Sequence, residues 1–304
     1  MKILITGSRG CIGRTLVAEL ERRGHDVWGC DLAHAGRARY TRCDVRVYRQ
    51  LERLFDEHAF EYVYNLAAEY GRWNGEDYYE NLWTSNVVGA KNILRLQERR
   101  RFRLIQFSSA EVYGDYDGRM EESVMDTVPL KQMNDYAMTK WVNEMQVLNS
   151  AAMFGTESVR VRPVNVYGPG EEYTPYRGVV PAFIHKALAR QPYTVYLGHK
   201  RIFDYVEDTC RTFANIVDNF IPGEVYNVGG PQEWEHEIKY LSDLILAHLG
   251  LDDSLVTYKE AEPFTTRVKT IDTTKAKRDL RHESRIDIEV GIPRTIDWMK
   301  AQSR

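Results

Sequence analysis

The sequence predicts a doubly wound α/β protein, in which a parallel sheet carries helices on both faces, with a smaller α+β domain towards the C-terminus. Short apolar runs alternate with segments of helical periodicity through the first half of the 304 residues. A glycine-rich turn follows the first run, and past residue 164 the order of elements becomes irregular. We therefore expect domains at 1–164 and 165–304, with a segment near 200–222 returning to the first domain.

The elements of the first domain can be assigned in order. An apolar run that stops at a glycine begins the chain and predicts the first strand. The next segment repeats apolar residues three and four positions apart, which indicates a helix. The two patterns then recur. Strands are expected at Lys2–Thr6, Asp26–Cys30, Tyr40–Cys43, Tyr62–Asn65, Arg103–Ser108 and Val159–Val164, and helices at Cys11–Arg23, Glu80–Arg100 and Asp135–Met153.

Composition and charge exclude several classes of protein. The chain has 41 Lys+Arg against 44 Asp+Glu, so bulk charge suggests neither a nucleic-acid partner nor a membrane surface. No apolar segment approaches the roughly 18 residues that span a bilayer. The four cysteines lack CxxC spacing and the histidines are scattered, which predicts neither a disulfide framework nor a metal site. We expect a soluble, cytoplasmic, metal-free protein.

A phosphate-binding turn is predicted between the first strand and the first helix. The turn reads Gly7-Ser8-Arg9-Gly10-Cys11-Ile12-Gly13, which is a GxxGxxG pattern. Glycine allows the tight turn and lets backbone N–H groups approach a pyrophosphate, which the positive end of the helix also attracts. Because the pattern lies between a strand and a helix, it indicates a dinucleotide-binding sheet of the Rossmann type.

Acidic residues after the next two strands decide which dinucleotide is expected. Asp31 ends the second strand, where a carboxylate accepts a hydrogen bond from the ribose 2′-OH and repels a 2′-phosphate. NAD is therefore favoured, although Arg9 with Arg37 or Arg39 leaves NADP open. Asp44 has two equally weighted interpretations, because it either holds the adenine amino group or caps the helical segment that follows it.

A tyrosine and a lysine form the predicted reactive pair. Tyr136 and Lys140 lie four residues apart on one helix and therefore on one face. A nearby ammonium, together with a positively charged nicotinamide, lowers the pKa of a phenol towards neutral pH, so Tyr136 can remove a hydroxyl proton. Ser109 follows the fifth strand and can hydrogen-bond the same hydroxyl. Asn65-Leu66-Ala67-Ala68 supplies small residues that suit the nicotinamide ribose.

These motifs together resemble the extended short-chain dehydrogenases/reductases of the NAD-dependent epimerase/dehydratase family, which act on nucleotide sugars. The resemblance spans nearly the full chain and includes three further motifs, which are Asn86-Val87-Val88-Gly89, Arg162–Gly170 and Arg201–Asp208, the last with its aspartate displaced from the family pattern. It implies that NAD is held by Gly7, Arg9, Gly10, Cys11, Ile12, Gly13, Asp31, Asp44, Val45, Leu66, Ala67, Ala68, Asn86, Tyr136 and Lys140.

The resemblance also implies the reaction type, in which a sugar is oxidised at C4 to a ketone and usually receives the hydride back. A C4 ketone acidifies the neighbouring C–H groups, and Glu111 is the expected base if its segment stays extended beside Ser109. Its alternative role is a salt bridge. The position of the general acid in dTDP-glucose-type dehydratases is Ala110 here, so that acid is missing or comes from elsewhere. Epimerisation, dehydration, UDP-glucuronate-type decarboxylation, 4-keto-sugar reduction and a non-catalytic NAD-binding role all stay open.

The substrate side is expected to bind a nucleotide-diphosphate sugar. Arginines suit a diphosphate through their planar donor fork, although a surface ion pair is the alternative for each. The strip Glu69–Glu76 is rich in polar and aromatic residues and is expected to cover the sugar. The resemblance implies a homodimer formed through the two long helices. It assigns substrate contacts to Ser109, Ala110, Glu111, Asn165, Val180, Arg201 and Arg267.

Overall fold

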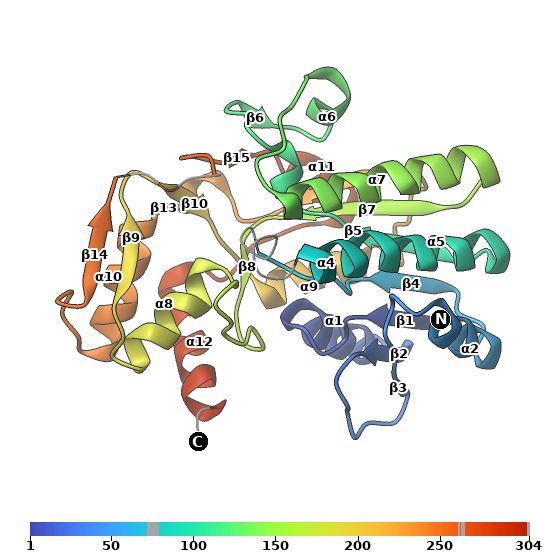
Figure 1. The fold of residues 1–304 in the computed structure, drawn as a ribbon, viewed down its shortest axis with the longest axis horizontal. Helices are drawn as coiled ribbons and strands as arrows, with labels where there is room; N and C mark the ends of the chain where they lie inside the picture. Colours follow the sequence, from blue (N-terminus) through green and yellow to red (C-terminus); the bar gives the residue numbers. More distant parts are fainter. Residues whose placement is uncertain (72–78, 261, 263–264, 303–304) are drawn as a thin grey trace.

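A seven-stranded parallel sheet forms the centre of the computed structural model, which describes residues 1–71, 79–260, 262 and 265–302 (Figure 1). The strand order is β12-β7-β5-β4-β1-β2-β3. The strands are β1 (Lys2–Thr6), β2 (Asp26–Asp31), β3 (Tyr40–Arg42), β4 (Tyr62–Asn65), β5 (Arg103–Phe107), β7 (Ser158–Pro163) and β12 (Val225–Val228). The predicted α/β, Rossmann-type sheet is confirmed.

Helices pack on both faces of the sheet because each carries an apolar stripe. On α1, for example, Leu16, Val17 and Leu20 recur at helical spacing and are buried against the strands. One face is covered by α1 (Cys11–Arg22), α9 (Val206–Asn215) and α11 (Thr274–Leu280). The other is covered by α2 (Tyr48–Glu57), α5 (Gly89–Arg100) and α7 (Asp135–Phe154).

The strand order places a ligand crevice at the centre of the sheet. The chain runs outward from β1 to β2 and β3, and it then returns to the opposite side of β1 to form β4. Open α/β sheets bind ligands at such a switch in winding, outside the carboxyl ends of the strands. In this chain those ends are Thr6 of β1 and Asn65 of β4, which pair directly.

A second lobe lies beside the sheet and has an apolar core of its own (left in Figure 1). Phe183, Val195, Leu241 and Ile292 are buried in that core. Its main elements are α8 (Val179–Leu188), β9 (Tyr193–Tyr196), α10 (Ile238–Leu249), β14 (Val256–Lys259) and α12 (Ile288–Gln302). Smaller elements are α4 (Tyr79–Trp83), α6 (Val124–Thr127) and the paired strands β6 (Arg119–Met120) with β15 (Thr270–Ile271), β8 (Val166–Tyr167) with β11 (Asp204–Tyr205), and β10 (Lys200–Ile202) with β13 (Glu235–Glu237).

The six expected strands are present, and the seventh comes from the C-terminal half. The chain returns to the sheet through α9, which packs on α1, and through β12, which pairs with β7. The predicted helix at Glu80–Arg100 is interrupted by a π-helical turn at Thr84–Val88. The division into domains at residue 164 stays a prediction. In the described ranges, no helix combines the length and the apolar character needed to cross a membrane.

Candidate active site

A cavity of about 740 Å³ lies at the carboxyl ends of the central strands and extends between the sheet and the second lobe. Ligand pockets usually have volumes of roughly 300–1,000 Å³, so its size suits a large organic ligand. Most of the predicted site residues line it. They are Gly7, Arg9, Gly10, Cys11, Ile12, Gly13, Asp31, Asp44, Val45, Leu66, Ala67, Ala68, Ser109, Ala110, Glu111, Tyr136, Lys140, Asn165, Val180 and Arg201. Asn86 and Arg267 are not brought to the cavity.

The glycine turn after β1 leaves no room for a Cβ at Gly7 or at Gly13. Gly7 has a φ of +65°, and a Cβ there would lie 2.9 Å from the Cα of Ala67. A Cβ on Gly13 would lie 2.2 Å from the carbonyl oxygen of Gly7. The same oxygen accepts the N–H of Gly10 over 3.1 Å, which closes the turn in front of α1. The bare backbone and the positive end of α1 therefore fit a pyrophosphate.

Asp31 is held in place at the end of β2. Its Oδ2 accepts the backbone N–H of Arg9 over 3.0 Å, which ties the carboxylate to the glycine turn. The arginines that left NADP open are engaged elsewhere. Arg37 pairs with Glu21, and Arg39 pairs with Asp26. The guanidinium of Arg9 donates to the backbone carbonyl of residue 34 over 2.6 Å. The carboxylate at the cavity thus favours a free ribose 2′-OH over a 2′-phosphate.

Asp44 lines the cavity, but its carboxylate also binds Arg46, two residues further along the chain. Its carboxylate accepts the backbone N–H of Arg46 over 2.9 Å and forms an ion pair with the guanidinium of the same residue at 2.7 Å. Burial alone would raise the pKa of Asp44, but the hydrogen bonds from Arg46 hold it below its usual value. The hydrogen bond to the N–H of Arg46 therefore supports the interpretation of Asp44 as a cap of the segment that follows it, although α2 begins only at Tyr48.

A row of buried polar side chains joins the ends of β1, β4 and β5. Thr6 Oγ1 donates to Asn65 Oδ1 over 2.7 Å, and Asn65 Nδ2 donates to Gln106 Oε1 over 2.9 Å. Thr6 Oγ1 also accepts the backbone N–H of Ala67 over 3.1 Å. The row therefore fixes the backbone that faces Gly7 across the cavity floor. Thr6 and Gln106 carry no sequence signal, because only strand pairing brings them side by side.

The first turn of α7 carries Tyr136 into the cavity. The side chain of Asn134 caps this helix by accepting the N–H of Ala137 over 2.9 Å. Tyr136 is 7% exposed, and its ring meets that of Tyr70 edge to face, with ring centroids 5.3 Å apart. Burial raises the pKa of Tyr136, and Tyr70 adds to this effect, whereas a hydrogen bond with Ser109 opposes it.

Lys140 lies one turn after Tyr136 on the same buried face, as the four-residue spacing predicts. Its Nζ donates to the backbone carbonyl of Phe107 over 3.0 Å and lies 5.7 Å from the centroid of the Tyr136 ring. Burial lowers the pKa of Lys140 to about 8. The protein's own groups thus leave the phenol neutral, so the predicted lowering of its pKa depends on the second positive charge, that of a bound nicotinamide.

Glu111 reaches the cavity from a turn and not from an extended segment. Ser109 Oγ accepts the N–H of Glu111 over 3.2 Å, and residues Ala110–Tyr113 form a 3₁₀ turn. The premise of an extended segment is therefore wrong, yet Glu111 still lines the cavity. It forms an ion pair with Lys269, whose side chain is only 6% exposed. Lys269 lies far along the chain and has no sequence signal, because only the tertiary fold brings it to Glu111.

Of the two predicted substrate arginines, the structure brings only Arg201 to the cavity. Arg201 is 8% exposed, and its guanidinium is fixed by hydrogen bonds to the loop at 265–267. One of these bonds goes to the backbone carbonyl of Arg267 over 3.0 Å. The side chain of Arg267 is exposed, and the residue supports Arg201 through its backbone.

Three further stretches of the second half complete the cavity wall. Asn165 has a φ of +41° and donates from Nδ2 to the carbonyl of Ile202 over 2.8 Å. Val180 is buried in the first turn of α8. Glu171 and Arg177, from the loop before α8, also line the cavity and were not expected there. In the strip expected to cover the sugar, Tyr70 lines the cavity, whereas residues 72–76 lie outside the described residues.

Asn86 lies behind the cavity wall. Its Oδ1 accepts the N–H of Glu69 over 2.7 Å, and its Nδ2 donates to the carbonyl of the same residue over 3.1 Å. Nδ2 also donates to Thr139 Oγ1 over 3.0 Å. Asn86 therefore ties the loop after β4 to α7, between Tyr136 and Lys140, and its predicted contact with the cofactor stays a prediction.

A buried ion cluster lies next to the predicted reactive pair on α7. Glu144, one turn beyond Lys140 on α7, accepts hydrogen bonds from Arg162 Nε and Nη2, both at 2.8 Å, and from Arg160 Nη1 at 3.2 Å. Ser108 Oγ donates to the same carboxylate over 2.5 Å. Glu144 is fully buried and Arg162 is 1% exposed. The cluster fixes α7 relative to the end of β5, where Ser109 follows.

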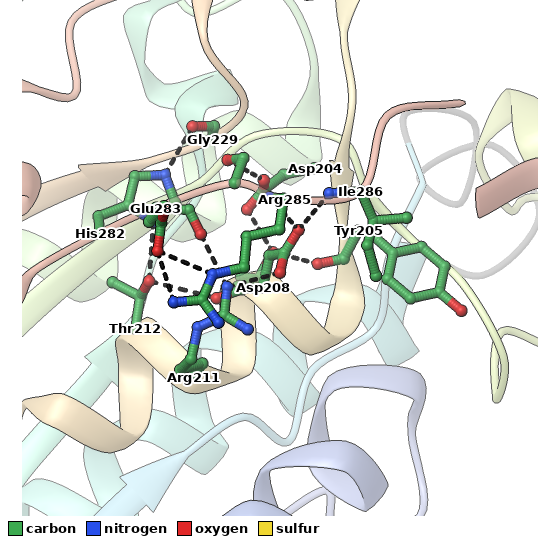
Figure 2. A network of polar contacts seen from close by, with 12 residues as sticks. Asp204, Tyr205, Asp208, Arg211, Thr212, Gly229, His282, Glu283, Arg285 and Ile286 are labelled. Carbon is green, nitrogen blue, oxygen red and sulfur yellow. Dashed lines mark hydrogen bonds and ion pairs between the residues drawn. The ribbon is translucent and has the colours of Figure 1, made fainter. Parts of the chain in front are cut away.

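The motif Arg201–Asp208 leads into a separate polar network (Figure 2). Asp204, at the displaced aspartate position, is buried and accepts the hydroxyl of Ser284 over 2.7 Å. Asp208 accepts the backbone N–H groups of residues 285–286 over 2.7 and 2.9 Å. Neither aspartate lines the cavity. This part of the motif thus joins α9 to the segment before α12.

The fold and the site define a class of protein. A phosphate-binding glycine turn, an acidic residue after β2, and a serine, a tyrosine and a lysine at the edge of a parallel sheet are the parts of a nicotinamide-dependent enzyme that moves a hydride and a proton. The chain belongs to the NAD dependent epimerase/dehydratase family, whose model matches residues 3–229. The expectations of an enzyme and of NAD as its cofactor are confirmed at the level of this family.

Relatives match the chain over nearly its whole length. It is 28% identical to the UDP-N-acetyl-alpha-D-glucosaminuronate decarboxylase of Bacillus cytotoxicus, covering 98% of each chain. It is 29% identical to a dTDP-glucose 4,6-dehydratase of Xanthomonas campestris, covering 97% of this chain and 92% of that one. Among solved structures, UDP-glucose 4-epimerase from Thermotoga maritima with UDP-glucose superposes with a TM-score of 0.89 at 25% identity, over 100% of both chains.

Proposed function

We propose that the cavity binds NAD together with a nucleotide-diphosphate sugar, and that the enzyme oxidises the sugar at C4 to a transient 4-keto intermediate. The observation that carries this proposal is the convergence of Ser109, Tyr136 and Lys140 in the cavity that the glycine turn and Asp31 also line. The names of the relatives support the substrate class, because they act on UDP- and dTDP-linked sugars.

Each residue has a distinct part in the oxidation. The phenolate of Tyr136 removes the proton of the sugar hydroxyl and becomes the neutral phenol, and the hydroxyl of Ser109 holds the same oxygen by a hydrogen bond. Lys140, cationic at neutral pH and 5.7 Å from the ring centroid, stabilises the phenolate. When bound, NAD supplies the acceptor for the hydride that leaves the same carbon. Arg201 binds phosphate oxygens of the nucleotide.

A tyrosine variant tests this assignment. The protein is incubated with UDP-glucose, dTDP-glucose, GDP-mannose and CDP-glucose, and products are followed by mass spectrometry and proton NMR. We expect Tyr136→Phe to keep NAD bound and to lower turnover at least about 100-fold. Tyr240→Phe, which removes an exposed hydroxyl of the second lobe, serves as the matched control. Turnover unchanged by Tyr136→Phe would refute the assignment of the base.

Decarboxylation is a second candidate, and Lys269 is the observation that favours it. The buried ammonium of Lys269, beside Glu111, would pair with a carboxylate of the sugar. A carboxylate on the carbon next to the C4 ketone is that of a β-keto acid, which readily loses carbon dioxide. Incubation with UDP-glucuronic acid distinguishes this candidate, because its product is lighter by the mass of carbon dioxide. An unchanged mass would rule out decarboxylation of that substrate.

We also propose a homodimer formed through α5 and α7. These helices pack side by side on one face of the sheet. The outer side of α7 exposes Met138, Met145 and Leu148, each 40% exposed and spaced as a helical stripe. Sizing by light scattering tests this proposal, and Met145→Glu is expected to shift the protein towards a monomer. A monomeric wild type would contradict it.

A further inference from the structure

Among the carboxyl groups that line the cavity, those of Glu111 and Glu171 have different surroundings. Glu111 forms an ion pair with Lys269, and the ammonium stabilises its ionised form. Glu171 comes from the loop between β8 and α8. Its Oε2 is enclosed and has no hydrogen-bond partner in the part of the chain that the structure describes. A charged oxygen in that position would be costly, because burial removes its hydration without replacing it.

The surroundings of Glu171 therefore favour its protonated form. Burial raises the pKa of Glu171 to about 7, against the opposing attraction of Arg177. A neutral carboxyl group has one O–H to donate, and the described residues offer no acceptor for Oε2. Because Oε2 is enclosed, the carboxyl group would donate to a ligand in the cavity from its other oxygen, Oε1, which lies on the side of Gly178. Glu111 has a cationic partner, whereas Oε2 of Glu171 has no partner among the described residues, so the two carboxyl groups differ in the way expected of a base and an acid.

Glu171 belongs to the wall that holds the reactive tyrosine. The ring of Tyr70 meets the ring of Tyr136, with centroids 5.3 Å apart. A Cβ at Gly178 would lie 3.5 Å from the hydroxyl of Tyr70 and 3.9 Å from Oε1 of Glu171, so both groups converge at this glycine. The carboxyl group therefore lies on the same side of the cavity as Tyr70, whose ring packs on Tyr136.

We propose that Glu171 is the general acid that protonates a departing hydroxyl of the sugar, in an elimination for which Glu111 is the base. This inference rests on the proposed oxidation at C4, because only a ketone makes the neighbouring C–H group acidic. The proposal also supplies the general acid that the turn after Ser109 lacks, because Ala110, which lines the cavity there, has only a methyl group and cannot donate a proton.

The elimination balances without any further reactant. Glu111 removes the proton from the carbon next to the ketone, and the electron pair of that C–H bond forms a C=C bond to the next carbon. The C–O bond on that carbon breaks, and its oxygen leaves as water with the proton of Glu171. The step begins with Glu111 ionised and Glu171 protonated, and it ends with these states reversed. No oxidant or reductant is consumed in it.

The test compares Glu171→Gln with the wild-type enzyme, and Glu207→Gln on the exposed start of α9 is the matched control. The sugar nucleotides are the four used for Tyr136→Phe, in D₂O. Three signals are recorded, which are the transient absorbance of reduced nicotinamide, deuterium incorporation next to the ketone, and product lighter by the mass of one water. We expect Glu171→Gln to keep the first two signals and to lose the third by about 100- to 10,000-fold.

Each other outcome has a defined meaning. Dehydration by Glu171→Gln at the wild-type rate overturns the proposal, and so does a loss of NAD binding in place of a loss of elimination. A wild type that forms the ketone but only epimerises the sugar also overturns it, while the proposed oxidation stands. If no sugar nucleotide reduces the cofactor, the proposed function itself fails.

A second readout does not depend on turnover. The infrared difference spectrum of wild type minus Glu171→Gln at near-neutral pH is expected to show a protonated carboxyl band that the difference between wild type and Glu207→Gln lacks, because Asp204 and Glu122, whose pKa values burial also raises, are unchanged in both variants. The groups whose charges act on Glu171 and its neighbour Cys11 are Arg177 and Arg14, and neither is changed in these variants. Absence of the band from the difference spectrum of wild type minus Glu171→Gln overturns the assignment of Glu171 as an acid.

Discussion

Replacing Glu144 by glutamine should destabilise the protein strongly. The carboxylate is fully buried and receives hydrogen bonds from two guanidinium groups and from Ser108. Glu144→Gln removes its charge and leaves Arg162, only 1% exposed, without an anionic partner. Breaking a buried ion pair on one side costs about 3–5 kcal/mol. With an m-value of about 3 kcal/mol/M, the urea midpoint should fall by roughly 1 to 1.7 M.

Two controls separate the charge from the packing. Replacing Glu144 and Arg162 together by apolar residues, as in Glu144→Leu with Arg162→Met, should recover part of the loss, because Arg162 no longer leaves an unpaired charge and only Arg160 still lacks its carboxylate partner. Burial alone would raise the pKa of Glu144, but hydrogen bonds from Arg162 hold this pKa below its usual value. Its stabilising effect is therefore present at neutral pH and is lost as the pH falls through the lowered pKa. The difference between wild type and Glu144→Gln should shrink accordingly.

Urea unfolding followed by circular dichroism measures these quantities. A midpoint for Glu144→Gln within about 0.3 M of the wild type at pH 7, equivalent to less than about 1 kcal/mol, would show that the cluster is not a buried ion pair in solution. A double variant no more stable than the single one would contradict the role of the unpaired guanidinium.

Three further predictions concern the cofactor side. Gly13→Ala should abolish NAD binding in calorimetry, because its Cβ would lie 2.2 Å from the Gly7 carbonyl oxygen, whereas Gly36→Ala meets no atom within 4 Å and should bind normally. Burial lowers the pKa of Lys140 to about 8, so turnover should fall as the pH rises above that value, and a profile flat to about pH 9 would contradict this. Asp31→Ala should weaken NAD binding by roughly tenfold, about 1.4 kcal/mol, and should lower the ratio of the affinity for NAD to the affinity for NADP. An unchanged ratio of these two affinities would refute the contact between Asp31 and the ribose.

The cofactor side of the cavity was predictable because its residues are close in sequence to strand ends. Gly7 and Asp31 directly follow or end a strand, and the pairing of β1 with β2 brings them together. Tyr136 and Lys140 needed only the period of one helix. Each inference depended on local geometry and on one rule, that ligands lie at the carboxyl edge of a parallel sheet.

Residues that depend on distant contacts could not be predicted in this way. Lys269 meets Glu111 across more than half the chain, and β12 joins the sheet from a segment with no regular alternation before it. The segment after Ser109 forms a turn and not the predicted extended structure for a different reason. A serine hydroxyl that accepts a nearby backbone N–H competes with extended structure, and this local preference decided the conformation.

The cofactor side and the substrate side of the cavity differ in how well they tolerate substitutions. The cofactor side is built from strand ends that are joined by buried hydrogen bonds such as Thr6 to Asn65, so a substitution there disturbs the sheet itself. The substrate side is built from loops, and the carboxyl of Glu171 and the ammonium of Lys269 reach the cavity from segments outside the sheet. A loop residue can be replaced without breaking a strand pair. If the proposed oxidation is correct, we expect these loop residues to decide the chemistry that follows it. Exchanging Glu171 or Lys269 should then alter the product before it alters the binding of NAD.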